Sequence, residues 1–148
     1  MTYNPNFTGN NTVPASASVK GTENNNSGFT IAQLTPVRIT STGDLGTVDP
    51  SIEAQVQAIA GLVGGDILNG SSGDIVSGGR ILNITTASIF GTQLYLSKTG
   101  GVTATQPDIG TAGFVVGDFV VSLGVIAKNA SNPSNKDFIV RILLVGQL

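Results

Sequence analysis

Residues 114–145 read FVVGDFVVSLGVIAKNASNPSNKDFIVRILLV, and this stretch decides the fold. It contains two long apolar runs, 114–127 and 138–145, separated by the polar loop 129–136. Both runs are rich in Val, Ile, Leu and Phe, which favour strands, whereas Asn, Ser and Pro favour loops. The first run is broken at Gly117-Asp118 and at Gly124. The second is continuous rather than alternating, so we expect a central strand that is covered on both faces or sealed by a neighbouring subunit.

The rest of the body is predicted to consist of short strands joined by tight turns. Residues 93–97 form the clearest strand, and Lys98-Thr99-Gly100-Gly101 is a hairpin-type turn because glycine tolerates positive φ. Turn signals recur about every 8–12 residues, which indicates an all-β fold, a small barrel or a sandwich-like body. The other predicted strands are 29–34, 37–40, 80–85 and 102–105, and further turns are predicted at 41–44, 69–74 and 77–79.

One short α-helix is expected, beginning at Asp49-Pro50. Asp49 suits the N-cap and Pro50 the first helical position. An apolar stripe follows at helical spacing, and Gly64-Gly65 supplies the stop, which gives a helix of about 13 residues. The stripe consists of Ile52, Val56, Ile59 and Val63. The helix is expected to cover a sheet, and the alternative is an exposed stripe used for oligomer contacts.

Residues 1–29 differ in composition from the body, 30–148. Asn, Ser, Thr, Gly and Pro dominate the segment, and its apolar residues are isolated. Such a segment buries too little surface to offset its ordering entropy. We predict an extended polar N-terminal arm that is either a disordered tail or orders on a partner surface. In the second case Tyr3, Phe7 and Val13 are the spaced anchors.

Composition argues against most chemistry. The chain of 148 residues suits one domain, and it contains no histidine and no cysteine, which removes Cys/His zinc sites and His-dependent nucleophiles. Charged residues make up 11%, against about 25% in an ordinary domain, which indicates that much surface is buried against other chains. The seven Lys and Arg residues are scattered, so no nucleic acid is expected, and no apolar run is long enough for a membrane span.

The nine acidic residues are predicted to shape turns, because most of them lie beside Gly, Pro or Asn. Calcium at a loop and catalysis by two facing carboxylates are the alternatives, and no Asp-x-Asp-x-Asp-Gly loop supports the former. The glycine clusters lack the following Lys-Ser/Thr of a nucleotide loop. We therefore expect no enzyme activity, no cofactor and no metal.

The C-terminal half carries a recognisable series of motifs: LYLSKTGG at 94–101, GFVVGDFV at 113–120, LGVIA at 123–127, and the terminal apolar strand that ends VGQL at 145–148. The series resembles small virion proteins of tailed bacteriophages, the capsid decoration, cement or head-fibre proteins. The resemblance covers roughly residues 37–148. It implies part of a β-barrel, a homo-oligomer that is often a trimer, and binding to the major capsid protein on the exterior of the virion.

Together these features predict a structural virion protein that stabilises the capsid lattice as a cement or decoration protein. The alternative is a phage fibre or receptor-binding module that contacts host-surface glycans, since similar β-modules occur at fibre ends. The two Tyr and six Phe residues lie mostly inside predicted strands, which argues mildly against a glycan-binding surface. A third interpretation, a small β-rich enzyme, would leave acid–base work to carboxylates alone.

Overall fold

The computed structural model describes residues 18–148, and the predicted anchors Tyr3, Phe7 and Val13 lie outside this range. The described chain is mostly β, as predicted, with one short helix, α1 (Glu53–Gln57). Its strands are β1 (Ser18–Asn25), β2 (Pro36–Ile39), β3 (Leu45–Thr47), β4 (Ile59–Val63), β5 (Ser71–Ile84), β6 (Gln93–Leu96), β7 (Val102–Thr103), β8 (Phe119–Lys128) and β9 (Lys136–Gln147).

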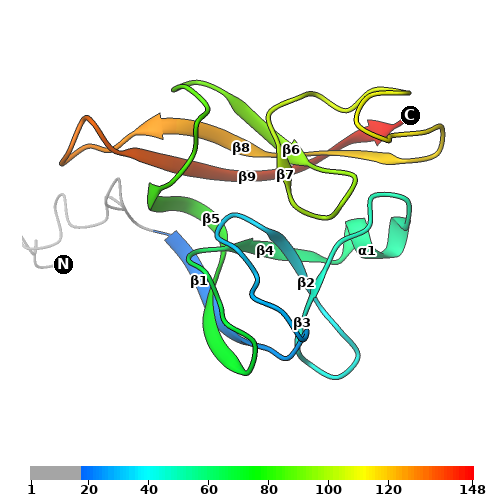
Figure 1. The fold of residues 1–148 in the computed structure, drawn as a ribbon, viewed down its shortest axis with the longest axis horizontal. Helices are drawn as coiled ribbons and strands as arrows, with labels where there is room; N and C mark the ends of the chain where they lie inside the picture. Colours follow the sequence, from blue (N-terminus) through cyan, green and yellow to red (C-terminus); the bar gives the residue numbers. More distant parts are fainter. Residues whose placement is uncertain (1–17) are drawn as a thin grey trace, which may run out of the picture.

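Strand β5 joins two groups of strands, one formed by β1 to β4 and the other by β6 to β9 (Figure 1). One edge of β5 pairs with β1, whereas the other edge pairs first with β4 and then with β9. The edges can be assigned because Gly79 pairs with both Ser18 and Val140, so that β1 and β9 must lie on opposite sides of it. The path β3-β2-β4-β5-β9-β8-β6-β7 thereby curls into an antiparallel half-barrel.

The main hydrophobic core lies between the two groups of strands. It contains fifteen buried residues, with Phe138, Leu123 and Leu96 among those that are fully enclosed. A second cluster of six residues covers the opposite face of β2, β4 and β5. Neighbouring residues on a strand point to opposite faces, so Leu62 and Val76 enter the main core while Val63 and Ile75 enter the second cluster.

The predicted helix of about 13 residues is wrong in its second half. Helix α1 ends at Gln57, and residues 59–63 form strand β4. An extended backbone lets Leu62 and Val63 supply both clusters, which a single helical stripe cannot do. Asp49 does not cap the helix either. Its carboxylate accepts hydrogen bonds from the Ser51 hydroxyl and backbone N–H, which lower the pKa of Asp49.

The predicted arm boundary at residue 29 is also wrong, because residues 18–25 form β1 and pair with β5. Asn25 then fixes the turn that follows. Its buried side-chain amide donates to the carbonyls of Phe29 and Ile67, while its side-chain oxygen accepts from Ser27. The strand predicted at 29–34 is reduced to one bridge, Ile31 with Ile67.

The turn predicted at 77–79 lies inside β5. Gly78 and Gly79 pair with Val19 and Ser18 of β1, and the register shifts between Val19 and Lys20. Gly79 has a φ of 85°, which glycine adopts without strain. These glycines therefore mark the place where β5 leaves one group of strands for the other, and they do not reverse the chain. The predicted turn at 98–101 is confirmed, with Gly100 at a φ of 86° between β6 and β7.

Gly124 allows β8 and β9 to approach closely. It pairs with Val140 and has a φ of 144°. A Cβ atom at this position would lie 1.9 Å from the carbonyl oxygen of Ile139, which is fixed backbone. The glycine of the LGVIA motif is therefore required by the β8–β9 ladder that closes the main core.

We predict that Gly124→Ala lowers the free energy of unfolding by about 3 kcal/mol or more, because the added methyl group must push β9 away. Urea denaturation followed by circular dichroism measures this change. Gly78→Ala is the matched control, since its Cβ would meet nothing within 4 Å, and its effect should stay within about 1 kcal/mol. Equal stability of the two variants would contradict the close-approach argument.

Candidate functional site

The most conspicuous surface of the described chain is apolar and lies at the end of β9. We define the β9 surface as the exposed residues Val115, Val116, Leu143, Leu144 and Val145. Val116 is 73% and Val145 56% exposed. Leu143 and Leu144 are consecutive strand residues, so their side chains point to opposite faces, and both faces of this part of β9 are exposed. Exposed apolar residues gathered at one strand end indicate an interaction site.

The C-terminal half of β9 also has an open edge. Pairing between β5 and β9 runs from Lys136 to Val140, and beyond that point the described pairing of β9 is with β8 alone. The prediction that the last apolar run is central is therefore confirmed for its first half, where Phe138 and Val140 are buried. Coverage on both faces is wrong for residues 143–145, which are exposed. Strand β5 turns away toward β4 and so also leaves their outer edge unpaired.

A buried ion pair holds Val115 and Val116 beside the end of β9. The Lys98 ammonium lies 2.7 Å from both carboxylate oxygens of Asp118, whose side chain is 1% exposed. Asp118 also accepts a hydrogen bond from the Val115 backbone N–H. Gly117 donates to the carbonyl of Leu148, and Leu148 donates to that of Asp118. These bonds fix the loop 115–118 against the last residue of the chain, which follows β9.

A shallow groove of about 570 Å³ borders this surface. Asp108 is its acidic residue, and Val145 connects it to the β9 surface. Arg141 is exposed at the start of the open part of β9. The ion pairs formed within residues 18–148 do not involve Asp108 or Arg141. The groove is lined by Gln106, Pro107, Asp108, Val120, Val145, Gly146, Gln147 and Leu148.

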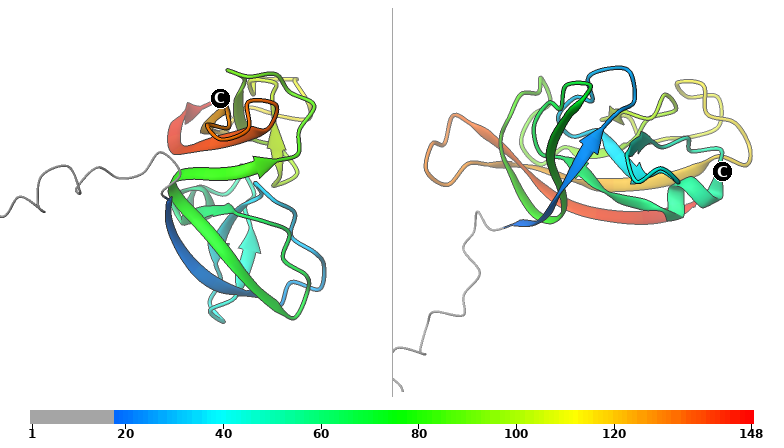
Figure 2. Two further views of the ribbon diagram at one scale, coloured as in Figure 1. Left: turned by 90° about the vertical axis from the view of Figure 1, so that its left-hand side faces the viewer. Right: turned by 90° about the horizontal axis from the view of Figure 1, so that it is seen from below.

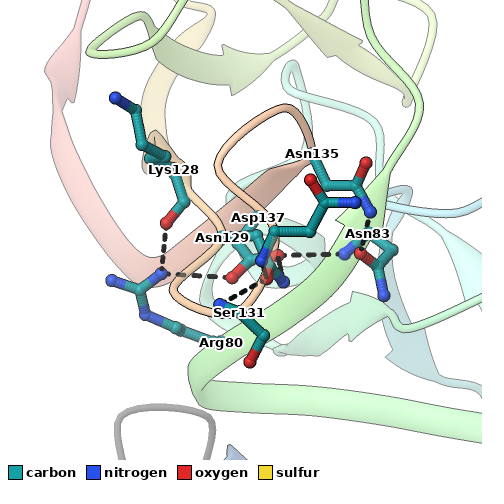
Figure 3. A network of polar contacts seen from close by, with 8 residues as sticks. Arg80, Asn83, Lys128, Asn129, Ser131, Asn135 and Asp137 are labelled. Atoms are coloured by element: carbon teal, nitrogen blue, oxygen red, sulfur yellow. Dashed lines mark hydrogen bonds and ion pairs between the residues drawn. The ribbon is translucent and has the colours of Figure 1, made fainter.

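The opposite end of the β8–β9 ladder carries a buried polar network (Figure 3). The Asp137 carboxylate is 1% exposed and accepts hydrogen bonds from Arg80, Asn129 and the backbone N–H of Asn83. Asn129 in turn accepts from the backbone of Ser131 and Asn132, which fixes the 129–135 loop. The side chains of the network therefore also bind backbone groups, at Lys128, Asn83, Ser131 and Asn132, and hold these segments in place.

Several carboxylates of the described chain make structural contacts, but the prediction that the acids shape turns holds only in part, because Asp74 and Asp137 lie inside strands β5 and β9. Asp118 and Asp137 order loops, and Asp44 accepts from Thr42 within a turn. Asp74 pairs with Lys20 across β1 and β5, and the hydrogen bond from Lys20 lowers the pKa of Asp74. Within residues 18–148 no group of three or more acidic residues could hold a metal ion.

Sequence reasoning identified the apolar residues of this surface without locating the surface. The composition of the run 114–127 favours a strand, yet Val115 and Val116 lie in a loop before β8. The sequence feature that indicates this loop is Gly117-Asp118, which interrupts the apolar run. Asp118 also supplies the buried carboxylate of the loop. Asn25 was missed as an organiser of the fold because it stands in a run of three asparagines within the predicted arm.

We predict that Asp137→Ala lowers the free energy of unfolding by about 3 kcal/mol, because it leaves the amide of Asn129 and the Asn83 N–H without their buried acceptor. Asp74→Ala removes an exposed pair with Lys20 and is the control, with a much smaller loss. Urea unfolding compares the two. Similar losses for both variants would show that the Asp137 network is not special.

Comparison with known proteins assigns no family. No protein-family model matches the chain, and no curated protein matches it. Among residues 18–148 there is no helix with the length and hydropathy needed to cross a membrane.

Proposed function

We propose that this chain is a structural virion protein that binds the outer surface of a phage capsid and stabilises the lattice. The single observation that carries the proposal is the β9 surface, an apolar area with an open strand edge on a body whose carboxylates serve structural roles. Such a surface is suited to binding protein. The resemblance of the C-terminal motifs to decoration and cement proteins is the reason for proposing a phage capsid as the assembly that the chain joins.

The architecture suits a module that must stay rigid between two attachment points. The motifs that carry the resemblance lie in β6, in β8 with the loop before it, and at the end of β9, and these three strands are neighbours in the sheet. Buried ion pairs anchor the loops near both ends of the β8–β9 ladder, with Asp137 at one end and Asp118 at the other. A braced sheet transmits force between two attachment points with little internal movement, which is what a cement protein requires.

Two attachments are proposed. The N-terminal segment binds the major capsid protein through the anchors Tyr3, Phe7 and Val13, and the body associates with further copies of itself. The resemblance favours a trimer for that homo-oligomer. Because β1 begins at Ser18, the capsid-binding segment is residues 1–17 rather than 1–29. Removing residues 18–29 would destroy the pairing with β5.

We predict that deleting residues 1–17 abolishes capsid binding while the body stays folded. Purified capsids that lack the protein are incubated with each variant and pelleted, and bound protein is quantified. Tyr3→Ala/Phe7→Ala/Val13→Ala should weaken binding on the order of tenfold or more, since each anchor loses its buried apolar contact. The control is Leu68→Ala, an exposed apolar residue in a turn of the body.

Undiminished binding of the truncation would reject the arm as the attachment site. Absence of wild-type binding to capsids would reject the proposed function itself. Cryo-electron microscopy of the intact particle then distinguishes the alternative, because density at the tail fibre, together with a hit on a glycan array, would favour a receptor-binding module.

A further inference from the structure

We propose that the β9 surface binds the same surface of a second copy, with the two β9 strands antiparallel about a two-fold axis near Leu144. The proposal does not rest on capsid binding, because it concerns the free protein. It stands in place of the trimer that the resemblance favours. A two-fold interface uses one patch on both partners and closes after two copies, so it cannot generate a three-fold ring.

The open strand edge is the first argument for an occupant. Strands that remain at an edge usually carry charges, proline or a covering loop, which prevent pairing with other chains. Residues 142–147 read ILLVGQ and contain neither a charge nor a proline. In Figure 2 (right) β9 runs along the outer margin of the molecule, so a second strand can approach it.

Charge complementarity identifies the occupant as a second copy. An antiparallel pairing centred on Leu144 places Arg141 of one copy opposite Gln147 of the other. Asp108 lines the same groove as Gln147. Arg141 and the groove that contains Asp108 therefore lie toward opposite ends of the open part of β9, and the proposed two-fold axis turns each Arg141 toward the groove of the second copy. An unrelated partner would need no such arrangement.

The interface must extend beyond the exposed apolar residues. A stable pair buries about 800 Å² on each partner, so polar contacts around these residues must contribute. The groove of about 570 Å³ with its polar lining provides the remaining contact around Val145. Register shifts between β8 and β9 bend the strand, so we expect strand pairing over a short run around Leu143 and Leu144.

The test is the mass of the full chain in sedimentation velocity between about 1 and 100 µM, a range chosen for a micromolar Kd. We expect a species of twice the 15.0 kDa chain mass. Leu143→Lys should shift the dimer toward monomer on the order of tenfold or more in Kd, because it places two like charges near the axis. Leu68→Lys, at a turn of the other group of strands, is the matched control and should leave the dimer unchanged.

Charge exchange then tests the register. Arg141→Asp and Asp108→Arg should each weaken the dimer, since each places like charges opposite one another. The double variant restores both pairs, and so does an equimolar mixture of the two single variants. Both residues are exposed, and urea unfolding verifies that the variants fold as the wild type does.

A monomer throughout the concentration range, or a trimer that survives Leu143→Lys, would overturn the proposal. Failure of both the double variant and the mixture to restore association would overturn the register. These outcomes leave capsid binding by residues 1–17 unaffected, so they are distinguishable from failure of the proposed function.

Discussion

The pairing of β5 with three other strands is the constraint on which the rest of the structure depends. At Gly79 the strand is held by β1 on one edge and β9 on the other, and a few residues earlier its second edge belongs to β4. A strand has only two edges, so β4 and β9 must diverge where one hands over to the other. That divergence curls the sheet, opens the space filled by the main core and leaves the C-terminal half of β9 paired with β8 on one edge only (Figure 2).

Two buried carboxylates show how a chain so poor in charge uses the charges it has. Asp118 and Asp137 are both almost fully enclosed, and each is matched by a cation and by backbone or amide donors. A buried charge is costly unless it is paired and hydrogen-bonded. Here the desolvation cost of each carboxylate is offset by hydrogen bonds from loop groups that would otherwise lack an acceptor. Examples are the backbone N–H of Val115 and the side-chain amide of Asn129. Within residues 18–148 these two carboxylates are the buried charged residues, and residues 142–147 of β9 carry no charge.

Sequence reasoning predicted the class of the fold because strand propensity and turn chemistry are local. The strand at 93–96, the turn at Gly100 and the loop before Lys136 all follow from their own residues. Sequence reasoning gave the wrong secondary structure where tertiary contacts determine the conformation of the backbone. Residues 59–63 carry a helical spacing, yet Leu62 and Val63 supply two separate clusters, and only an extended backbone satisfies both. A pattern within one segment cannot reveal that there are two cores.

The same limit applies to the candidate site. The apolar residues 143–145 are evident in the sequence, but their exposure depends on the direction in which β5 departs, which is a long-range property. The two interpretations given to the terminal run, covered on both faces or sealed by another subunit, therefore apply to different halves of one strand. Val140 and the residues before it are covered within the chain. The residues after it retain the composition of a buried strand without a cover, and a second β9 in the opposite direction provides one with the same composition and with complementary charges at its ends.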